Sequence, residues 1–318
     1  GKTWTSYAIT IFESKENVPG IQLLIDSILL DIDQSVSTYI DSSTISQFNR
    51  NNDSVALDCC TWNVVGHFSK NFKASLFAVE HTKGYFDPTV LPLVEYYGFG
   101  NKLEQAYTID SMIIDSIMQF VGFDSCFRII GDGDVVKTRS NIKLDFSAIA
   151  KGYMVDQISE LLDSLNHENY LVEIGGEVRT KGANTQGDPW NIAIEEPIEE
   201  TAQGDYIHAT IPLTNLSMAT SGNYRNYKAI NGQKVVHTIN PKTGFPEISN
   251  LLSATIITDD CAMADAYATA CMVMGLEKSK AFVEEGAGVE GFFIYSNEKG
   301  ELESFASSGI ADLIKYFN

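Results

Sequence analysis

The stretch LDFSAIAKGYMVD, from Leu144 to Asp156, constrains the fold of this chain more than any other. A short strand-like start gives way to a polar turn at Asp145, and the helical pattern that follows begins with Lys151 and Gly152. This junction brings a carboxylate and an ammonium group close together along the chain. A lysine in this position can meet a phosphate as a point charge. A helix cap followed by a surface lysine is the structural alternative.

A second motif, ADAYAT, places Asp265 and Thr269 four residues apart in an apolar helical pattern that runs from Cys261 to Met274. Residues i and i+4 share one face of a helix. A carboxylate and a hydroxyl on one face are oxygen ligands of the kind that magnesium takes, together with a carbonyl and substrate phosphates. An exposed Asp near the helix start, with the Thr packed inward, is the alternative.

Three further segments carry weaker signals. Gly175–Gly176 follows a predicted buried strand, where glycines permit close backbone approach to a flat or anionic ligand, or form a plain tight turn. His237 lies in the short predicted strand that precedes a rigid Asn-Pro turn, and it is either a general base or a surface residue. Tyr39 and the run Tyr85–Phe86–Asp87 either stack on an aromatic ligand or belong to the core.

Composition bounds the class of protein. The chain has 318 residues and 44% hydrophobic residues, which is enough to bury a sizeable core. Its net charge of −20 argues against a nucleic-acid partner. No apolar run reaches the ~18–20 residues that a membrane span needs. The sequence has no C-x-x-C pair, and Cys261 and Cys271 are expected to be buried thiols.

The order of predicted elements indicates an α+β fold with mixed sheets and packed helices, rather than a doubly wound parallel sheet. Strands outnumber helices after residue 165, and their order is irregular. We expect one domain over residues 1–318. The predicted helices cover 18–33, 62–83, 111–121, 151–165, 261–274 and 277–284, and the predicted strands cover 4–12, 170–174, 190–194, 207–213, 235–239, 253–257 and 289–295, with a hairpin at 127–136.

Taken together, the motifs resemble the flavin transferase family often called ApbE, the FAD:protein FMN transferases. The matching segments follow the family order along nearly the whole chain. They are GKTWTSYAITI, SVSTY, SSTISQFN, GYFDPTVLPLVEYYGFG, LDFSAIAKGYMVD, YLVEIGGEV, ATSGNYRNY, HTINPKTGFP and MADAYATA. The resemblance implies an ApbE-like single compact unit.

The resemblance also implies roles for individual residues. The residues matching the family's FAD contacts are Tyr39, Tyr85, Phe86, Asp87, Asp145, Lys151 and Ile239. The residues matching its magnesium ligands are Ala148, through its carbonyl, Asp265 and Thr269. His237 matches a histidine that acts as the base, and Asp265 is assigned to catalysis through the metal.

The implied reaction is a magnesium-dependent transfer of FMN from FAD to a threonine hydroxyl of a partner protein, with release of AMP. Alternatives are an FAD pyrophosphatase that releases FMN and AMP, and a non-catalytic FAD-binding protein. An adhesive or structural module of the envelope ranks last. The family further implies an acceptor such as a subunit of a redox pump or an envelope reductase. It implies a location in the bacterial periplasm or on the outer face of the cell envelope, with a lipid anchor outside residues 1–318.

Overall fold

The computed structural model describes residues 6–12, 20–50, 55–56, 64–99, 109–130, 134–197, 206–223, 227–230, 233–247 and 249–317. The chain forms two compact units, and each is built from segments that are distant in sequence. Unit 1 comprises Gly1–Ile25, Lys151–Arg225 and Ser249–Asn318, and unit 2 comprises Asp26–Ala150 and Asn226–Ile248.

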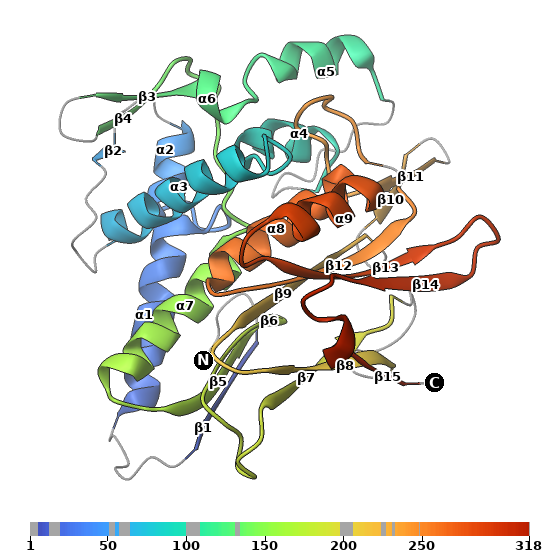
Figure 1. The fold of residues 1–318 in the computed structure, drawn as a ribbon. Coiled ribbons are helices and arrows are strands. Elements are labelled where there is room, and N and C mark those ends of the chain that lie inside the picture. Colours follow the sequence, from blue (N-terminus) through green and yellow to red (C-terminus); the bar gives the residue numbers. More distant parts are fainter. Residues whose placement is uncertain are drawn as a thin grey trace. The chain divides into compact units, whose positions relative to one another are not determined.

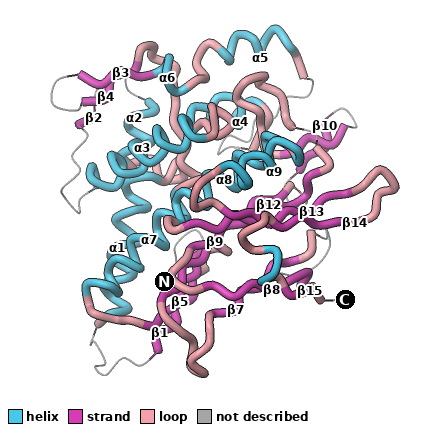
Figure 2. The backbone as a smooth tube through the Cα atoms, viewed as in Figure 1, coloured by secondary structure: helices cyan, strands magenta, loops and turns pink. Residues whose placement is uncertain are grey.

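Unit 1 contains two antiparallel sheets. The larger sheet has the strand order β1-β5-β6-β9-β12-β13-β14, and the smaller one has the order β15-β8-β7. Figure 2 shows β12, β13 and β14 as neighbouring strands. The strands of the larger sheet are β1 (Tyr7–Phe12), β5 (Asn169–Ile174), β6 (Glu177–Lys181), β9 (Ser217–Gly222), β12 (Leu251–Thr258), β13 (Glu290–Ser296) and β14 (Leu302–Ala306). The strands of the smaller sheet are β7 (Trp190–Glu195), β8 (Ile207–Leu213) and β15 (Lys315–Tyr316).

One hydrophobic core joins the two sheets of unit 1. Trp190 and Ile211 of the smaller sheet belong to the same buried cluster as Ile257 and Phe292 of the larger sheet. Neighbouring residues of a strand point to opposite faces, so buried Ile256 faces away from this cluster. Helix α8 (Cys261–Met274) packs on β9 and β12, and α9 (Leu276–Glu285) packs on α8 and β13 (Figure 1). Both faces of the sheet are therefore covered at β12.

Unit 2 is mainly helical and carries two small antiparallel sheets, β2-β4-β3 and β10-β11. Phe68 and Phe72 of α3 pack against Phe48, Phe123, Phe127 and Phe146 in an aromatic cluster. Its helices are most of α1 (Ile21–Val36), α2 (Thr44–Arg50), α3 (Val64–His81), the 3-10 turn η1 (Pro88–Val90), α4 (Leu91–Tyr96), α5 (Ser111–Met118) and α6 (Phe123–Cys126). Its strands are β2 (Val55–Ala56), β3 (Phe127–Ile130), β4 (Asp134–Lys137), β10 (Tyr227–Ile230) and β11 (Gln233–Val236).

The expected α+β class is confirmed, and most predicted elements appear within a few residues of their expected bounds. Every strand pair among the described residues is antiparallel, a more uniform pattern than the mixed sheets expected. The prediction of a strand-like segment at residues 142–144 is wrong, because this segment joins no sheet. The tip of the predicted hairpin, residues 131–133, lies outside the described residues, as do residues 224–226 of ATSGNYRNY.

Candidate functional site

Helix α8 holds the predicted magnesium ligands of unit 1. Asp260 caps its N-terminus, where its carboxylate accepts a hydrogen bond from the Met263 amide at 2.9 Å. Asp265 lies in the second turn with only 3% of its surface exposed, which rules out the exposed-Asp alternative. Thr269 lies one turn further on, and its Oγ1 is 3.1 Å from Oγ of Ser221 on β9. The helix therefore places a buried carboxylate and a hydroxyl on one face.

Lys151 is the first-turn lysine of helix α7 (Ala150–Ser164), and it forms an ion pair with Glu177. Glu177 begins β6, directly after the turn Gly175–Gly176 that joins β5 to β6. Both glycines have positive φ, as a two-residue hairpin turn demands. The Gly-Gly pair is thus a tight turn, and it sets the position of a carboxylate that the sequence analysis did not select.

Burial and charge shift the pKa values of this cluster. Burial lowers the pKa of Lys151, but the carboxylates of Asp265 and Glu177 outweigh this effect and raise it to about 12. Burial and the nearby Asp265 raise the pKa of Glu177, against the opposing effect of Lys151. Burial also raises the pKa of Asp265, while Lys151 and the Gly152 amide oppose the shift. The lysine is therefore a fixed positive charge at neutral pH.

The oxygen atoms in this part of unit 1 suit a hard cation. Oε2 of Glu177 is buried and has no hydrogen-bond partner among the described residues. Asp265 adds a second buried carboxylate, and Thr269 adds a hydroxyl. Magnesium needs only one or two carboxylates, because waters and substrate phosphates complete its shell. Within the described ranges no group of three or more His, Cys, Asp and Glu residues is placed to hold a metal ion.

Asp145 and Ala148 belong to unit 2, in the turn before α7. The Asp145 carboxylate accepts hydrogen bonds from the amide and hydroxyl of Ser147 at 2.9 and 2.5 Å. The side chain of Asn49 bonds both backbone groups of Leu144, at 2.7 and 2.8 Å, and so takes the place of a neighbouring strand. The Asp145 amide donates to the Pro88 carbonyl at 2.8 Å. This turn is therefore held by side chains and by backbone contacts from distant segments.

The Tyr85–Phe86–Asp87 run is divided between core and surface. Asp87 caps η1, and its carboxylate accepts hydrogen bonds from Thr89 and from the Phe123 amide at 2.6 to 2.9 Å. Phe86 is buried, whereas the half-buried ring of Tyr85 has the ammonium of Lys242 4.0 Å from its centre. The side chains of Asp87 and Phe86 thus shape this turn from within.

The remaining predicted site residues of unit 2 lie on two other segments. His237 follows β11 directly and is half-buried, with its ring 6.4 Å from that of Phe99. Ile239 is buried in a core cluster and pairs with Pro246 in an isolated β-bridge. Tyr39 lies before α2 with 67% of its surface exposed, a position open to a ligand.

Comparison with known proteins identifies the family. A family model described as the ApbE family matches residues 4–293. The chain belongs to the ApbE family. A curated relative from Haemophilus influenzae, named FAD:protein FMN transferase, is 35% identical over 268 residues, which cover 82% of this chain and 74% of the relative. A relative of the same name from Vibrio cholerae is 34% identical over 290 residues, covering 91% of this chain and 83% of the relative.

Solved structures of ApbE proteins share the fold. The flavin transferase ApbE from Vibrio cholerae matches with a TM-score of 0.84 and 30% identity, over 98% of this chain and 97% of that protein. The ApbE protein from Thermotoga maritima matches with a TM-score of 0.82 and 28% identity, over 97% and 96% of the two chains. The expectation of an ApbE-family transferase is confirmed. Among the described residues, no helix combines the length and apolar character that crossing a bilayer requires.

Proposed function

We propose that this chain transfers FMN from FAD to a threonine hydroxyl of a partner protein, releases AMP and depends on magnesium, with residues 1–318 acting as one domain. The names of the ApbE relatives support flavin transfer from FAD to a protein. The observation that carries the proposal is the cluster of Asp265, Thr269 and Lys151 in unit 1. It combines oxygen ligands for a cation with a permanent positive charge, which is what a phosphoryl transfer requires.

Asp265 and Thr269 would hold the magnesium ion, and the family resemblance adds the Ala148 carbonyl. The bound ion would act as a Lewis acid on the pyrophosphate and offset the charge that develops as AMP leaves. The Asp265 carboxylate is already oriented in this structure, since it accepts a hydrogen bond from the Gly152 amide. A ligand fixed in advance needs little rearrangement during the reaction.

Lys151 would bind the negatively charged phosphate oxygens of FAD. Its ammonium group stays protonated at neutral pH because two carboxylates lie near it. Glu177 fixes its direction through the ion pair. The lysine thereby supplies charge at a defined place, and little binding free energy is lost in ordering its side chain.

His237 would accept the proton of the threonine hydroxyl as that oxygen attacks the phosphorus on the riboflavin side of FAD. The new bond joins the threonine oxygen to this phosphorus, and the bond from the phosphorus to AMP breaks. Tyr39 and Tyr85 would contact the flavin, with Asp145 and Ile239 as further FAD contacts. Among the flavin candidates, Tyr39 has the most exposed ring.

The acceptor would be an envelope protein with a threonine in a flavinylation site, such as a subunit of a redox pump or an envelope reductase. We place the reaction in the bacterial periplasm or on the outer face of the cell envelope, with a lipid anchor in the precursor. The family relationship supports these assignments. The location can be tested by expressing the labelled precursor in a bacterial host and fractionating the cells. The mature protein is expected in the envelope fraction.

One incubation separates this function from its alternatives. The purified protein is mixed with FAD and magnesium, with and without an acceptor protein, and the products are separated by chromatography. FMN covalently attached to the acceptor is expected, together with one AMP per FMN attached. Free FMN and AMP at the same rate in both samples would identify a pyrophosphatase. FAD that stays intact in both samples would identify a binding protein.

A further inference from the structure

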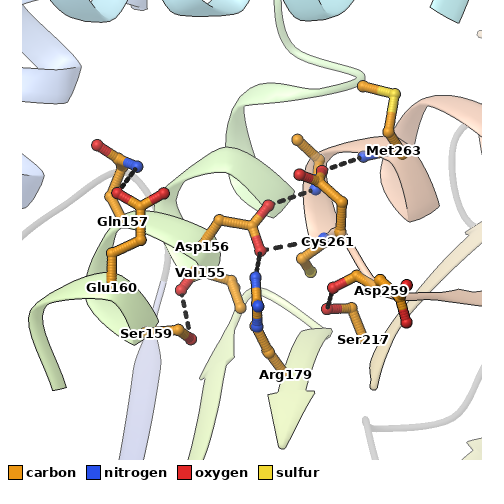
Figure 3. A network of polar contacts seen from close by, with 12 residues as sticks. Val155, Asp156, Gln157, Ser159, Glu160, Arg179, Ser217, Asp259, Cys261 and Met263 are labelled. Carbon is orange, nitrogen blue, oxygen red and sulfur yellow. Dashed lines mark hydrogen bonds and ion pairs between the residues drawn. The ribbon is translucent and has the colours of Figure 1, made fainter. Parts of the chain in front are cut away.

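Asp156, on α7, connects three elements of unit 1. Its Oδ1 accepts a hydrogen bond from the Arg179 guanidinium on β6, with an Nη1–Oδ1 distance of 2.6 Å. Its two oxygens also accept from the amides of Cys261 and Ala262, at 3.1 and 2.9 Å. Figure 3 shows this carboxylate between the arginine and the first turn of α8. Only 5% of the Asp156 surface is exposed.

The bonds from α8 to Asp156 satisfy two helix amides to which the Asp260 side chain does not bond. The first amides of a helix have no partner within the helix, and the residue preceding it usually accepts from one of them. Asp260 already fills this role through its bond from Met263. Asp156 comes from a different helix, so its two bonds add a link between α7 and α8. Arg179 balances the buried charge of this link.

The link lies next to the groups that the proposed function uses. Lys151 is five positions before Asp156 on α7, and Asp265 is three positions after Ala262 on α8. The two helices touch closely at Gly152, where a Cβ atom would lie 2.1 Å from the Cys261 carbonyl oxygen. A small shift of α8 along α7 would therefore move Asp265 away from the first turn of α7.

We propose that Asp156 is a positioning residue that locks α8 against α7 and so holds Asp265 and Thr269 in the place where they bind a cation. The proposal rests on the proposed function, because it assigns the cation to these two ligands. Asp156 itself does not contact the cation. It acts through the backbone of α8, as partners outside the ligand set of a metal site commonly do.

The test compares Asp156→Asn and Asp156→Ala with Asp260→Ala. Asp260→Ala is the matched control, because it removes a carboxylate cap from the same helix end and leaves the two hydrogen bonds from α8 to Asp156 in place. Binding of Mn²⁺, which takes the same oxygen ligands, is measured by loss of the free-ion signal in electron paramagnetic resonance. Exchange of the Cys261 and Ala262 amides is followed by hydrogen–deuterium exchange. Asp156→Asn keeps one acceptor oxygen and serves as the milder variant if Asp156→Ala fails to fold.

We expect both Asp156 variants to bind Mn²⁺ about 10- to 100-fold more weakly than the wild type, the range typical of lost supporting contacts. The Cys261 and Ala262 amides should exchange faster in the same variants. Asp260→Ala should lower the melting temperature while leaving Mn²⁺ affinity within about twofold, since the cap is lost but the bonds from Cys261 and Ala262 to Asp156 remain.

Three results would count against the proposal, and they differ. Wild-type Mn²⁺ affinity in Asp156→Asn, together with faster amide exchange, would show that the link only stabilises the fold. Absence of Mn²⁺ binding to the wild-type protein with FAD present would overturn the proposed function, and this inference with it. Equal weakening by Asp260→Ala would also overturn the role of Asp156, because any damage to the helix end would then suffice.

Discussion

The backbone amide of Gly152 donates a hydrogen bond to Oδ2 of Asp265, at 3.3 Å, although 113 positions separate the two residues. The bond joins the first turn of α7 to the second turn of α8. It favours the ionised form of a carboxylate whose pKa is raised by burial. The residue that donates this bond also lies directly against the Cys261 backbone, which leaves no space for a Cβ atom.

Gly152→Ala should destabilise the protein, against the usual effect of this substitution in a helix. Replacing glycine by alanine normally stabilises a helix by ~0.5–1 kcal/mol. Here the added Cβ would lie 2.1 Å from the Cys261 oxygen and 2.8 Å from the Ala262 Cα, both of them backbone atoms. We expect a loss of about 1–3 kcal/mol, measured by urea denaturation, with a fall in FAD turnover. An increase in the free energy of unfolding would contradict the prediction, because it would mean that α7 and α8 can move apart at Cys261 without loss of stability.

Asp265→Asn should lower magnesium-dependent AMP release from FAD by roughly 10²–10³-fold, the usual cost of losing one charge-stabilising contact. The fold should survive, because the amide has the same shape as the carboxylate and its burial carries less cost. The measurement is AMP release by chromatography, with the melting temperature as the check on folding. Asp260→Asn on the same helix is the control. Wild-type release by Asp265→Asn would remove this residue from the metal site.

His237→Gln should reduce transfer to an acceptor by roughly 10²–10⁴-fold, the usual contribution of a general base. FAD affinity should change little, because the proposed role concerns the acceptor hydroxyl. His237 is only half-buried, so the variant should fold. Attached flavin is measured by fluorescence of the acceptor in gels, and FAD affinity by quenching of flavin fluorescence. Transfer at the wild-type rate would mean that a group other than His237 takes the proton of the threonine hydroxyl.

His67, on α3 of unit 2, should make the protein sensitive to mild acid. Burial, with a smaller effect of Lys70, lowers its pKa from 6.5 to about 4, while Asp31 opposes the shift. The unfolded chain therefore binds a proton between pH 6.5 and 4 that the folded chain does not. Stability is fully present above pH 6.5 and is lost as the pH falls towards 4, by up to roughly 3 kcal/mol.

The check on this prediction is the difference between variants. Urea denaturation at several pH values from 7 to 4 should show a shallower loss of stability for His67→Gln than for the wild type. His81→Gln, which removes an exposed histidine from the end of the same helix, is the matched control for the loss of a histidine side chain. Parallel curves for wild type and His67→Gln would show that His67 takes up its proton in the folded state.

Local sequence signals were sufficient for helix α8 and for the shared face of Asp265 and Thr269. Its apolar pattern lies between a capping aspartate, Asp260, and a terminal glycine, Gly275, so both ends are specified by adjacent residues. The spacing of Asp265 and Thr269 then follows from the helical repeat. Their burial follows from packing on β9 and β12, which the apolar pattern indicates but does not locate.

Residues whose partners lie far along the chain could not be predicted. Glu177 becomes a site candidate only through its ion pair with Lys151, 26 positions earlier. Asp156 becomes one only through hydrogen bonds from amides more than 100 positions later. Leu144 looks like part of a strand because it is apolar, yet its backbone bonds are taken by the side chain of Asn49. The Gly175–Gly176 turn was the available signal for Glu177, because a two-residue hairpin places that residue opposite Ile174.

Helix α8 has small buried side chains at many positions, and this limits how the protein can be re-engineered. Buried alanines occur along its length, at Ala262, Ala264, Ala266, Ala268 and Ala270. Larger residues at these positions would crowd the elements that pack around the helix. Attempts to change the preferred cation would therefore do best to exchange the ligand atoms of Asp265 or Thr269 and leave their neighbours untouched.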